Sequence, residues 1–191
     1  SHKTQKIIIA AVAAAVILVV SFIVIQSVIR VRNNQKFDHL MEAGTAGLKE
    51  GDWSTAKTSF TSAIEVFDRD EAKSLETIAS RLEAADKELQ KAKRATGKNA
   101  IAAFNAARKQ IDSRDALLKS PAYEYIKSWM EAWTKAEHDA LLAYTETLES
   151  PKEKVELWVE FLKNHKNSRF DKPVSARNKT LLVSYYSDEY S

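Results

Sequence analysis

One apolar stretch constrains this chain more than any other feature. Residues 7–25 read IIIAAVAAAVILVVSFIVI, in which Ser21 is the only polar residue, and the stretch extends to residue 29 by adding Gln26 and Ser27. At about 1.5 Å per residue the longer span covers roughly 34 Å, close to the ~30 Å hydrocarbon core of a bilayer. Because no charge interrupts them, residues 7–29 predict one transmembrane helix.

Basic residues flank this stretch on both sides. Lys3 and Lys6 precede it, and Arg30 and Arg32 follow it, so that their side chains can extend to the two membrane interfaces. A core helix is rarely apolar on every face for five turns, and a cleaved signal peptide has a shorter apolar run followed by an Ala-x-Ala site. We therefore expect a single-pass membrane protein. The positive-inside rule is nearly balanced, and we slightly favour an extracytoplasmic (periplasmic) domain in a bacterial inner membrane.

Charge is unevenly distributed along the chain. The first 36 residues hold five of the 29 basic residues and no acidic residue, so the remainder is slightly acidic and the basic character belongs to the membrane flanks. No basic face indicates nucleic acid as a partner, and we expect none. The absence of cysteine excludes a disulfide framework, a thiol nucleophile and a cysteine-based metal site.

Motifs for catalysis, metal binding or cofactor binding are missing from the sequence. The four histidines form no HExxH or His-x3-His arrangement, and each is interpreted as a surface residue: His2, His39, His138 and His165. No glycine-rich phosphate loop occurs, and the four tryptophans lie on apolar stripes typical of a core. We therefore expect no catalytic residue, no cofactor and no metal, and we expect that the chain is not an enzyme.

The sequence after residue 36 predicts helices rather than strands. Only four Gly and three Pro interrupt it, and apolar residues recur at helical spacing. The expected helices span 36–50, 53–66, 71–94, 98–112 and 121–148. A further helix begins at 151 and ends at a loop (165–168), and a last helix spans 173–183. Ser120-Pro121 and Ser150-Pro151 each predict a helix start, with Ser at the N-cap and Pro at the first helical position. Glu153 completes a capping box with Ser150.

Residues 37–67 carry the pattern of a helical hairpin. A small pair, a Gly-Asp-aromatic turn and an Ala-x3-Phe-x2-Ala helix follow one another: Ala43-Gly44, Gly51-Asp52-Trp53, and Ala56, Phe60 and Ala63. This pattern resembles one tetratricopeptide (TPR) repeat, a helix–turn–helix unit of about 34 residues. Its small residues let the two helices pack closely, and its Phe fills the space between repeats. The Ala-x3-Phe-x2-Ala spacing recurs at Ala100, Phe104 and Ala107, and a degenerate repeat occurs around Trp158 and Phe161.

The resemblance implies a protein-binding module. TPR repeats usually bind peptides or partner helices on the concave surface of their first helices, and the corresponding outward positions here are Asp38, Met41, Thr45 and Leu48. Met41 and Thr45 replace the Lys and Asn of the family's carboxylate clamp, so no such clamp is expected. The second repeat departs from the family, because it follows after 44 residues and has Lys87-Glu88 in place of the small pair. A generic helical bundle therefore stays an alternative.

These observations predict an all-α chain with five parts. A short basic flank (1–6), a transmembrane helix (7–29) and a basic juxtamembrane linker (30–36) precede a TPR-like domain of antiparallel helical hairpins (37–183) and a tail (184–191). We expect a membrane-tethered adaptor or scaffold with protein partners, in contact with lipid through its helix. The alternatives are a sensor or stalk segment of a larger receptor or kinase, whose signalling domain would precede Ser1, and an accessory subunit of a large membrane complex.

Overall fold

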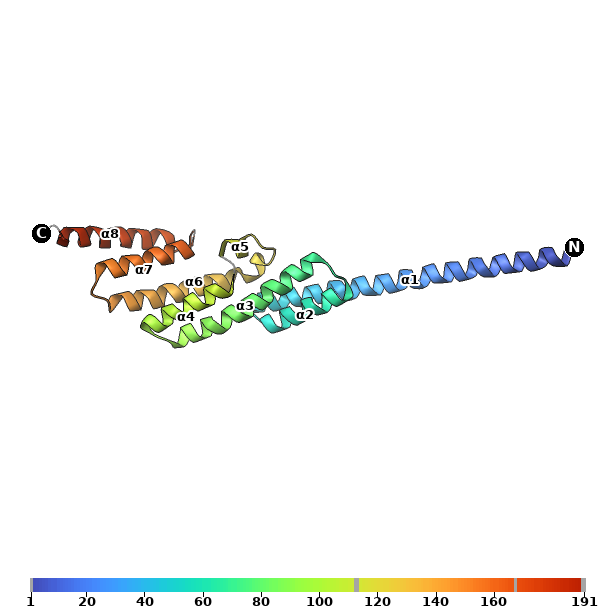
Figure 1. The fold of residues 1–191 in the computed structure, drawn as a ribbon, viewed down its shortest axis with the longest axis horizontal. Helices are drawn as coiled ribbons and strands as arrows, with labels where there is room; N and C mark the ends of the chain where they lie inside the picture. Colours follow the sequence, from blue (N-terminus) through green and yellow to red (C-terminus); the bar gives the residue numbers. More distant parts are fainter. Residues whose placement is uncertain (1, 112–113, 167, 190–191) are drawn as a thin grey trace.

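The computed structural model describes residues 2–111, 114–166 and 168–189, and in these residues it contains helices and no strand (Figure 1). The all-α fold class is therefore confirmed. The N- and C-terminal ends lie at opposite ends of an elongated molecule (Figure 1). The helices are α1 (His2–Glu50), α2 (Trp53–Val66), α3 (Asp70–Arg94), α4 (Gly97–Gln110), α5 (Arg114–Leu118), α6 (Tyr123–Glu146), α7 (Pro151–Asn164) and α8 (Asp171–Glu189).

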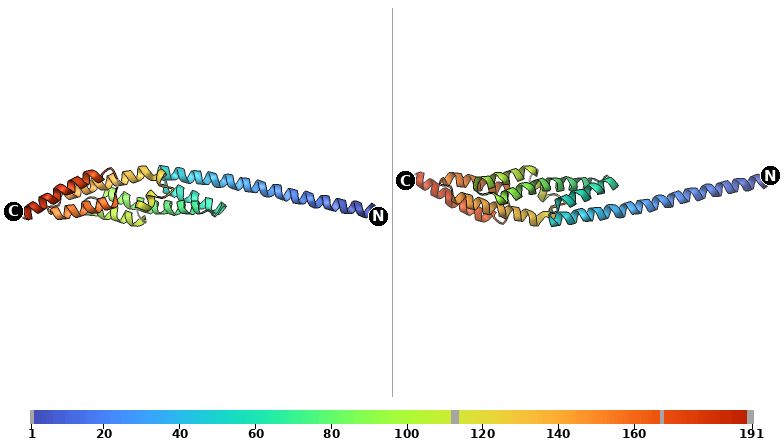
Figure 2. Two further views of the ribbon diagram at one scale, coloured as in Figure 1. Left: turned by 90° about the horizontal axis from the view of Figure 1, so that it is seen from above. Right: turned by 90° about the horizontal axis from the view of Figure 1, so that it is seen from below.

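The apolar stretch and the first helix of the domain form one helix. α1 is a helix of 49 residues, and residues 30–36, which we expected to be a linker, are helical within it. This segment holds neither Gly nor Pro, so nothing in it interrupts the backbone hydrogen bonds of a helix. From Ala13 onward α1 is long and apolar enough to span a membrane, and its apolar window is not buried against the rest of the chain. The views in Figure 2 show this part as a single rod extending from the domain.

α1 and α2 form a tight antiparallel hairpin. Gly51 takes a positive φ of 74° in the turn, which glycine adopts without strain. Asp52 then caps α2, because its carboxylate accepts a hydrogen bond from the Thr55 backbone N–H at 3.0 Å. A Cβ atom at Gly47 would lie 2.8 Å from the backbone nitrogen of Ala56, so the two helices cross almost in backbone contact.

The next hairpins continue the same core. α2 packs on α3 and α3 on α4, and α6 then packs on α4 and on the end of α1. Acidic residues in the first turn of α3 and basic residues in its last turn complement the helix dipole. The fully buried Phe60 and Phe104 lie in one continuous cluster with the apolar face of α3. All four tryptophans contribute to the core: Trp53, Trp133 and Trp158 are buried, and Trp129 packs against the main cluster.

The two Ser-Pro pairs behave differently. At α7 the prediction is confirmed, because the Ser150 hydroxyl accepts a hydrogen bond from Glu153 N–H at 3.3 Å and Pro151 is the first helical residue. The prediction for Ser120 as an N-cap is wrong. α6 begins at Tyr123, and the Ser120 hydroxyl instead donates to the Leu117 carbonyl at 2.7 Å. Ser120 therefore closes the end of α5.

α7 and α8 form the last hairpin, and α8 extends through residues 184–189, which we expected to belong to the tail.

Candidate interaction site

The structure separates the four residues predicted to form a partner-binding surface. Asp38 is exposed, Met41 and Thr45 are partly buried, and Leu48 is 1% exposed. Met41 packs against two core clusters, and Leu48 belongs to the main one. The prediction that Leu48 faces outward is therefore wrong, and these four residues do not form a continuous free surface.

α6 covers the end of the first hairpin. Its N-terminal part meets the C-terminal end of α1 (Figure 2), where the Lys49 ammonium lies 5.3 Å from the centroid of the Tyr125 ring. Trp129 packs edge to face on Trp53 with ring centroids 5.1 Å apart, and its indole N–H donates to Asp86 at 3.0 Å. The surface of α1 on which we predicted a partner is therefore partly covered by the chain's own sixth helix.

A groove of about 540 Å³ lies instead along the first half of α3. On this helix the lining residues share one face over about three turns, which is roughly 16 Å. The opposite wall comes from the end of α4, from α5 and from the turn before α6. The described lining residues are Asp70, Lys73, Ser74, Thr77, Ile78, Arg81, Ile111, Ala116, Leu117, Ser120 and Pro121.

The groove has an apolar floor and a charged rim. Ile78, Ile111 and Leu117 belong to the core cluster or pack against it, and they supply the floor. At the rim Lys73 lies 2.5 Å from Asp68 and 3.8 Å from Asp70, and the hydrogen bond to Asp68 raises the pKa of Lys73. An apolar floor between charged edges suits the apolar face of an amphipathic segment.

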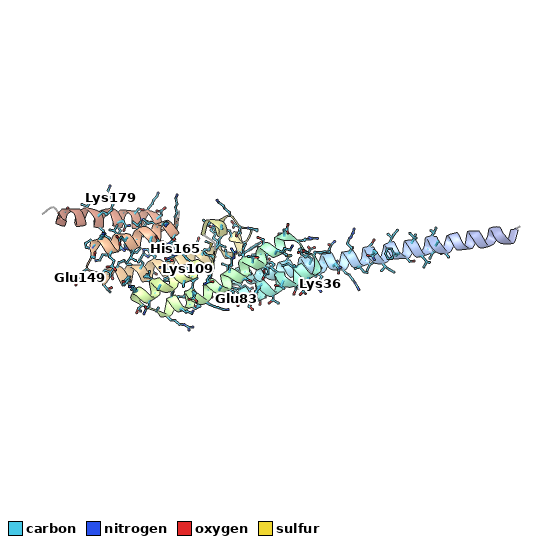
Figure 3. The ribbon with its side chains drawn as sticks, viewed as in Figure 1. Lys36, Glu83, Lys109, Glu149, His165 and Lys179 are labelled. Carbon is cyan, nitrogen blue, oxygen red and sulfur yellow. The ribbon has the colours of Figure 1, made fainter. Side chains whose placement is uncertain are left out.

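A second feature, a buried ionic cluster, joins α4, α6 and α7. Glu137 of α6 is 4% exposed and forms an ion pair with Arg108 of α4. Its other oxygen accepts hydrogen bonds from the Trp133 indole N–H at 3.1 Å and from His165 Nε2 at 2.9 Å. Figure 3 shows His165 at the end of α7, next to α6. The remaining ring nitrogen of His165 lies 3.2 Å from the Thr134 hydroxyl.

The partners of Glu137 keep its carboxylate ionised. Burial alone would raise its pKa, but the hydrogen bond from His165 and the positive charge of Arg108 together hold the pKa of Glu137 below its ordinary value. Both oxygens of the Glu137 carboxylate contact side chains inside the protein. The cluster therefore fits a structural contact that joins three helices better than a reactive site.

Sequence reasoning missed this cluster. His165 was interpreted as a surface residue, which is wrong, because it is 3% exposed. His138 is partly buried and stacks on Phe170 with ring centroids 4.3 Å apart, whereas His39 is exposed as predicted. The side chain of His2 lies outside the described residues. Arg108, Glu137 and His165 are so far apart in the sequence that no spacing pattern links them.

The site geometry thus consists of a groove on α3, a buried ionic joint and an exposed apolar helix. Among the described residues, no group of three or more His, Cys, Asp or Glu side chains is arranged to hold a metal ion. No protein-family model, no curated protein and no solved structure matches this chain.

Proposed function

We propose that this protein is a single-pass membrane adaptor that holds a protein partner in the groove along α3. The observation that carries the proposal is the continuity of α1. One helix contains both an apolar stretch, which is exposed from Ala13 onward, and the first helix of a packed helical domain. An exposed apolar surface of this length is costly in water, and a bilayer removes that cost.

The close packing of the first hairpin supports a TPR-like origin for the domain. Gly44 and Gly47 allow α1 to approach α2, and Phe60 lies fully buried against Gly44. Such hairpin modules usually bind other proteins rather than catalyse reactions. In this chain α6 occupies part of the expected concave surface, so we place the partner in the α3 groove instead of on the residues 38–48.

The occupant that suits this groove is an amphipathic helical segment of two to three turns. Its apolar residues would contact Ile78 and Leu117, and its charged residues would pair with the rim. Anchoring restricts the adaptor to the membrane, which raises the effective concentration of any partner on the same surface.

The test uses two matched threonine variants of the full chain. Thr77 is exposed and lines the groove, whereas Thr58 is exposed on α2 outside it. We expect Thr77→Arg to fill the groove and to abolish the cross-links between α3 and a partner, seen by mass spectrometry after gentle detergent extraction. Thr58→Arg should leave them intact. Cross-links that persist in Thr77→Arg, or a partner that never contacts α3, would refute the groove assignment.

A further inference from the structure

The last helix buries an asparagine that has no hydrogen-bond partner. Val174, Asn178 and Leu181 follow one another at helical spacing, so they lie on one face of α8, and this face packs on α7. Asn178 is 5% exposed. Neither its amide oxygen nor its amide nitrogen bonds to any residue that the structure describes. A buried amide of this kind loses its hydrogen bonds to water and gains none in return, which weakens the packing of α8.

α7 offers α8 a strongly apolar surface. Trp158 and Phe161 are at most 2% exposed and lie in one apolar cluster with a valine of α8. The guanidinium of Arg177 lies 5.4 Å from the centroid of the Trp158 ring, so α8 covers this ring directly. Leu182 and Val183, on the same helix, are exposed. α8 thus turns an amide toward α7 while two of its aliphatic side chains face solvent.

The two helices of this last hairpin are held to the domain in different ways. His165 ends α7, and its Nε2 atom lies 2.9 Å from the carboxylate of Glu137 on α6. The His138 ring of α6 also contacts the rings of Trp158 and Phe161, with centroids 5.4 and 5.9 Å apart. α8, in contrast, packs mainly on α7 and lies at the end of the molecule farthest from the apolar part of α1 (Figure 1). α8 can therefore leave its place while α7 stays attached to α6.

We infer that α8 is a displaceable cover and that the face of α7 beneath it binds an amphipathic helix of a partner protein. This face already holds one helix, α8, so it has the shape that a helix requires. A partner helix with leucine in the place of Asn178 would bury the same surface without the unpaired amide. The site is separate from the groove on α3, and it does not depend on the membrane anchor.

The test uses the full chain in detergent and labelled synthetic peptides of residues 169–189. One peptide has the sequence of the chain, and a second carries Asn178→Leu. Fluorescence anisotropy measures the binding of each peptide to the chain. We expect the leucine peptide to bind about tenfold more tightly than the unchanged peptide. In the full chain, Asn178→Leu strengthens the cover and should weaken the binding of the leucine peptide about tenfold.

Thr180 provides the matched control, because it is exposed on α8 two residues after Asn178. A Thr180→Leu peptide gains the same leucine outside the contact with α7, so it should bind like the unchanged peptide. This control also accounts for any attraction of a more apolar peptide to the detergent. A leucine peptide that binds no better than the Thr180→Leu peptide would overturn the inference.

Hydrogen exchange of the chain without peptide gives an independent readout. We expect the backbone amides of α8 to exchange faster than those of the core helix α3, and Asn178→Leu to slow their exchange. Exchange in α8 as slow as in α3 would show that the cover does not open. Faster exchange of α8 in Asn178→Leu would show that the amide contributes to the packing, and either result would contradict the inference.

Discussion

At the scale of single residues, Glu137 shows how a buried charge fixes the relation between helices. Its carboxylate joins Arg108 from α4 and His165 from the end of α7, and α6 otherwise has limited contact with α7. Replacing one member of a buried ionic group leaves the others unpaired, which costs more than the group contributes to stability. The cluster therefore specifies how α4, α6 and α7 pack more than it adds to the hydrophobic core.

The depressed pKa of Glu137 predicts acid sensitivity. Because the folded pKa lies below the ordinary 4.5, the group stabilises the folded state above that pH and loses this contribution as the pH falls through the folded pKa. We expect the free energy of unfolding of the full chain in detergent, followed by tryptophan fluorescence, to fall below about pH 4.5. Glu137→Gln should lower the free energy of unfolding by about 3 kcal/mol at neutral pH. Below about pH 4.5 the free energy of unfolding of this variant should then fall less steeply than that of the parent chain.

Glu131→Gln provides the matched control for that measurement, because Glu131 lies on the same helix and is exposed. This variant should keep both the stability and the pH dependence of the parent chain. If the stability of Glu137→Gln fell below pH 4.5 as steeply as that of the parent chain, the carboxylate of Glu137 would not be the group responsible for the acid sensitivity.

Residues whose environment comes from distant helices were beyond sequence reasoning. The outward assignment of Leu48 followed from its place in a repeat, but Leu48 is buried in a cluster that includes residues of α6, which begins more than 70 residues later. His165 ends α7 and carries no local sign of its partners on α6. By contrast, the burial of Phe60 and Ala63 was predictable, because helical spacing alone places them on the apolar face of α2.

At the scale of elements, local signals were reliable where the chain makes no competing contact. The bounds of α2 agree with the predicted 53–66, because Gly51 and Asp52 fix the start locally. Ser150 also caps α7 as expected. Ser120 has the same local sequence signal, but the end of α5 lies directly before it and accepts its hydroxyl hydrogen. A cap prediction therefore fails where a second element ends within a few residues.

The α1–α2 hairpin offers a test in which two glycines should behave differently. A Cβ at Gly44 would clash with the Phe60 ring, whereas a Cβ at Gly47 would clash with backbone atoms of Ala56 and Asp52 at the start of α2. Each Gly→Ala change favours the helix by about 1 kcal/mol, because alanine has a higher helix propensity than glycine. We expect the overpacking to cost more than this, so that each variant has a free energy of unfolding about 1–2 kcal/mol below that of the parent chain. Phe60→Leu should relieve Gly44→Ala and not Gly47→Ala.

Chemical denaturation of the single and double variants, arranged as two double-mutant cycles, measures this difference. A favourable coupling of about 1 kcal/mol between Gly44→Ala and Phe60→Leu, with none at Gly47→Ala, is the expected result. Equal coupling at both positions would show that α2 shifts as a body to relieve the clash, and that the hairpin is less rigid than its backbone contact indicates.

At the scale of the whole molecule, the uninterrupted α1 determines how the domain is presented. A flexible linker would let the groove face any direction, whereas a continuous helix transmits the orientation of its apolar part to the domain. α3 runs from the α2–α3 turn away from the apolar stretch toward the far end of the molecule (Figure 1). If the apolar stretch spans a membrane as we propose, the groove on the first half of α3 lies at the end of the domain nearest that membrane.

Breaking α1 between the apolar stretch and the domain should remove this fixed presentation. Asn34 is exposed within the helical segment 30–36, and Asn34→Pro interrupts the backbone hydrogen bonds there at a cost of about 3 kcal/mol. With a single spin label at Lys98→Cys, an exposed position at the start of α4, we expect a narrow distance distribution to labelled headgroups in the parent chain and a broad one in Asn34→Pro. Asn34→Ala keeps the helix and should keep the narrow distribution. A broad distribution in the parent chain would mean that α1 bends in the membrane-bound protein and that the groove has no fixed orientation.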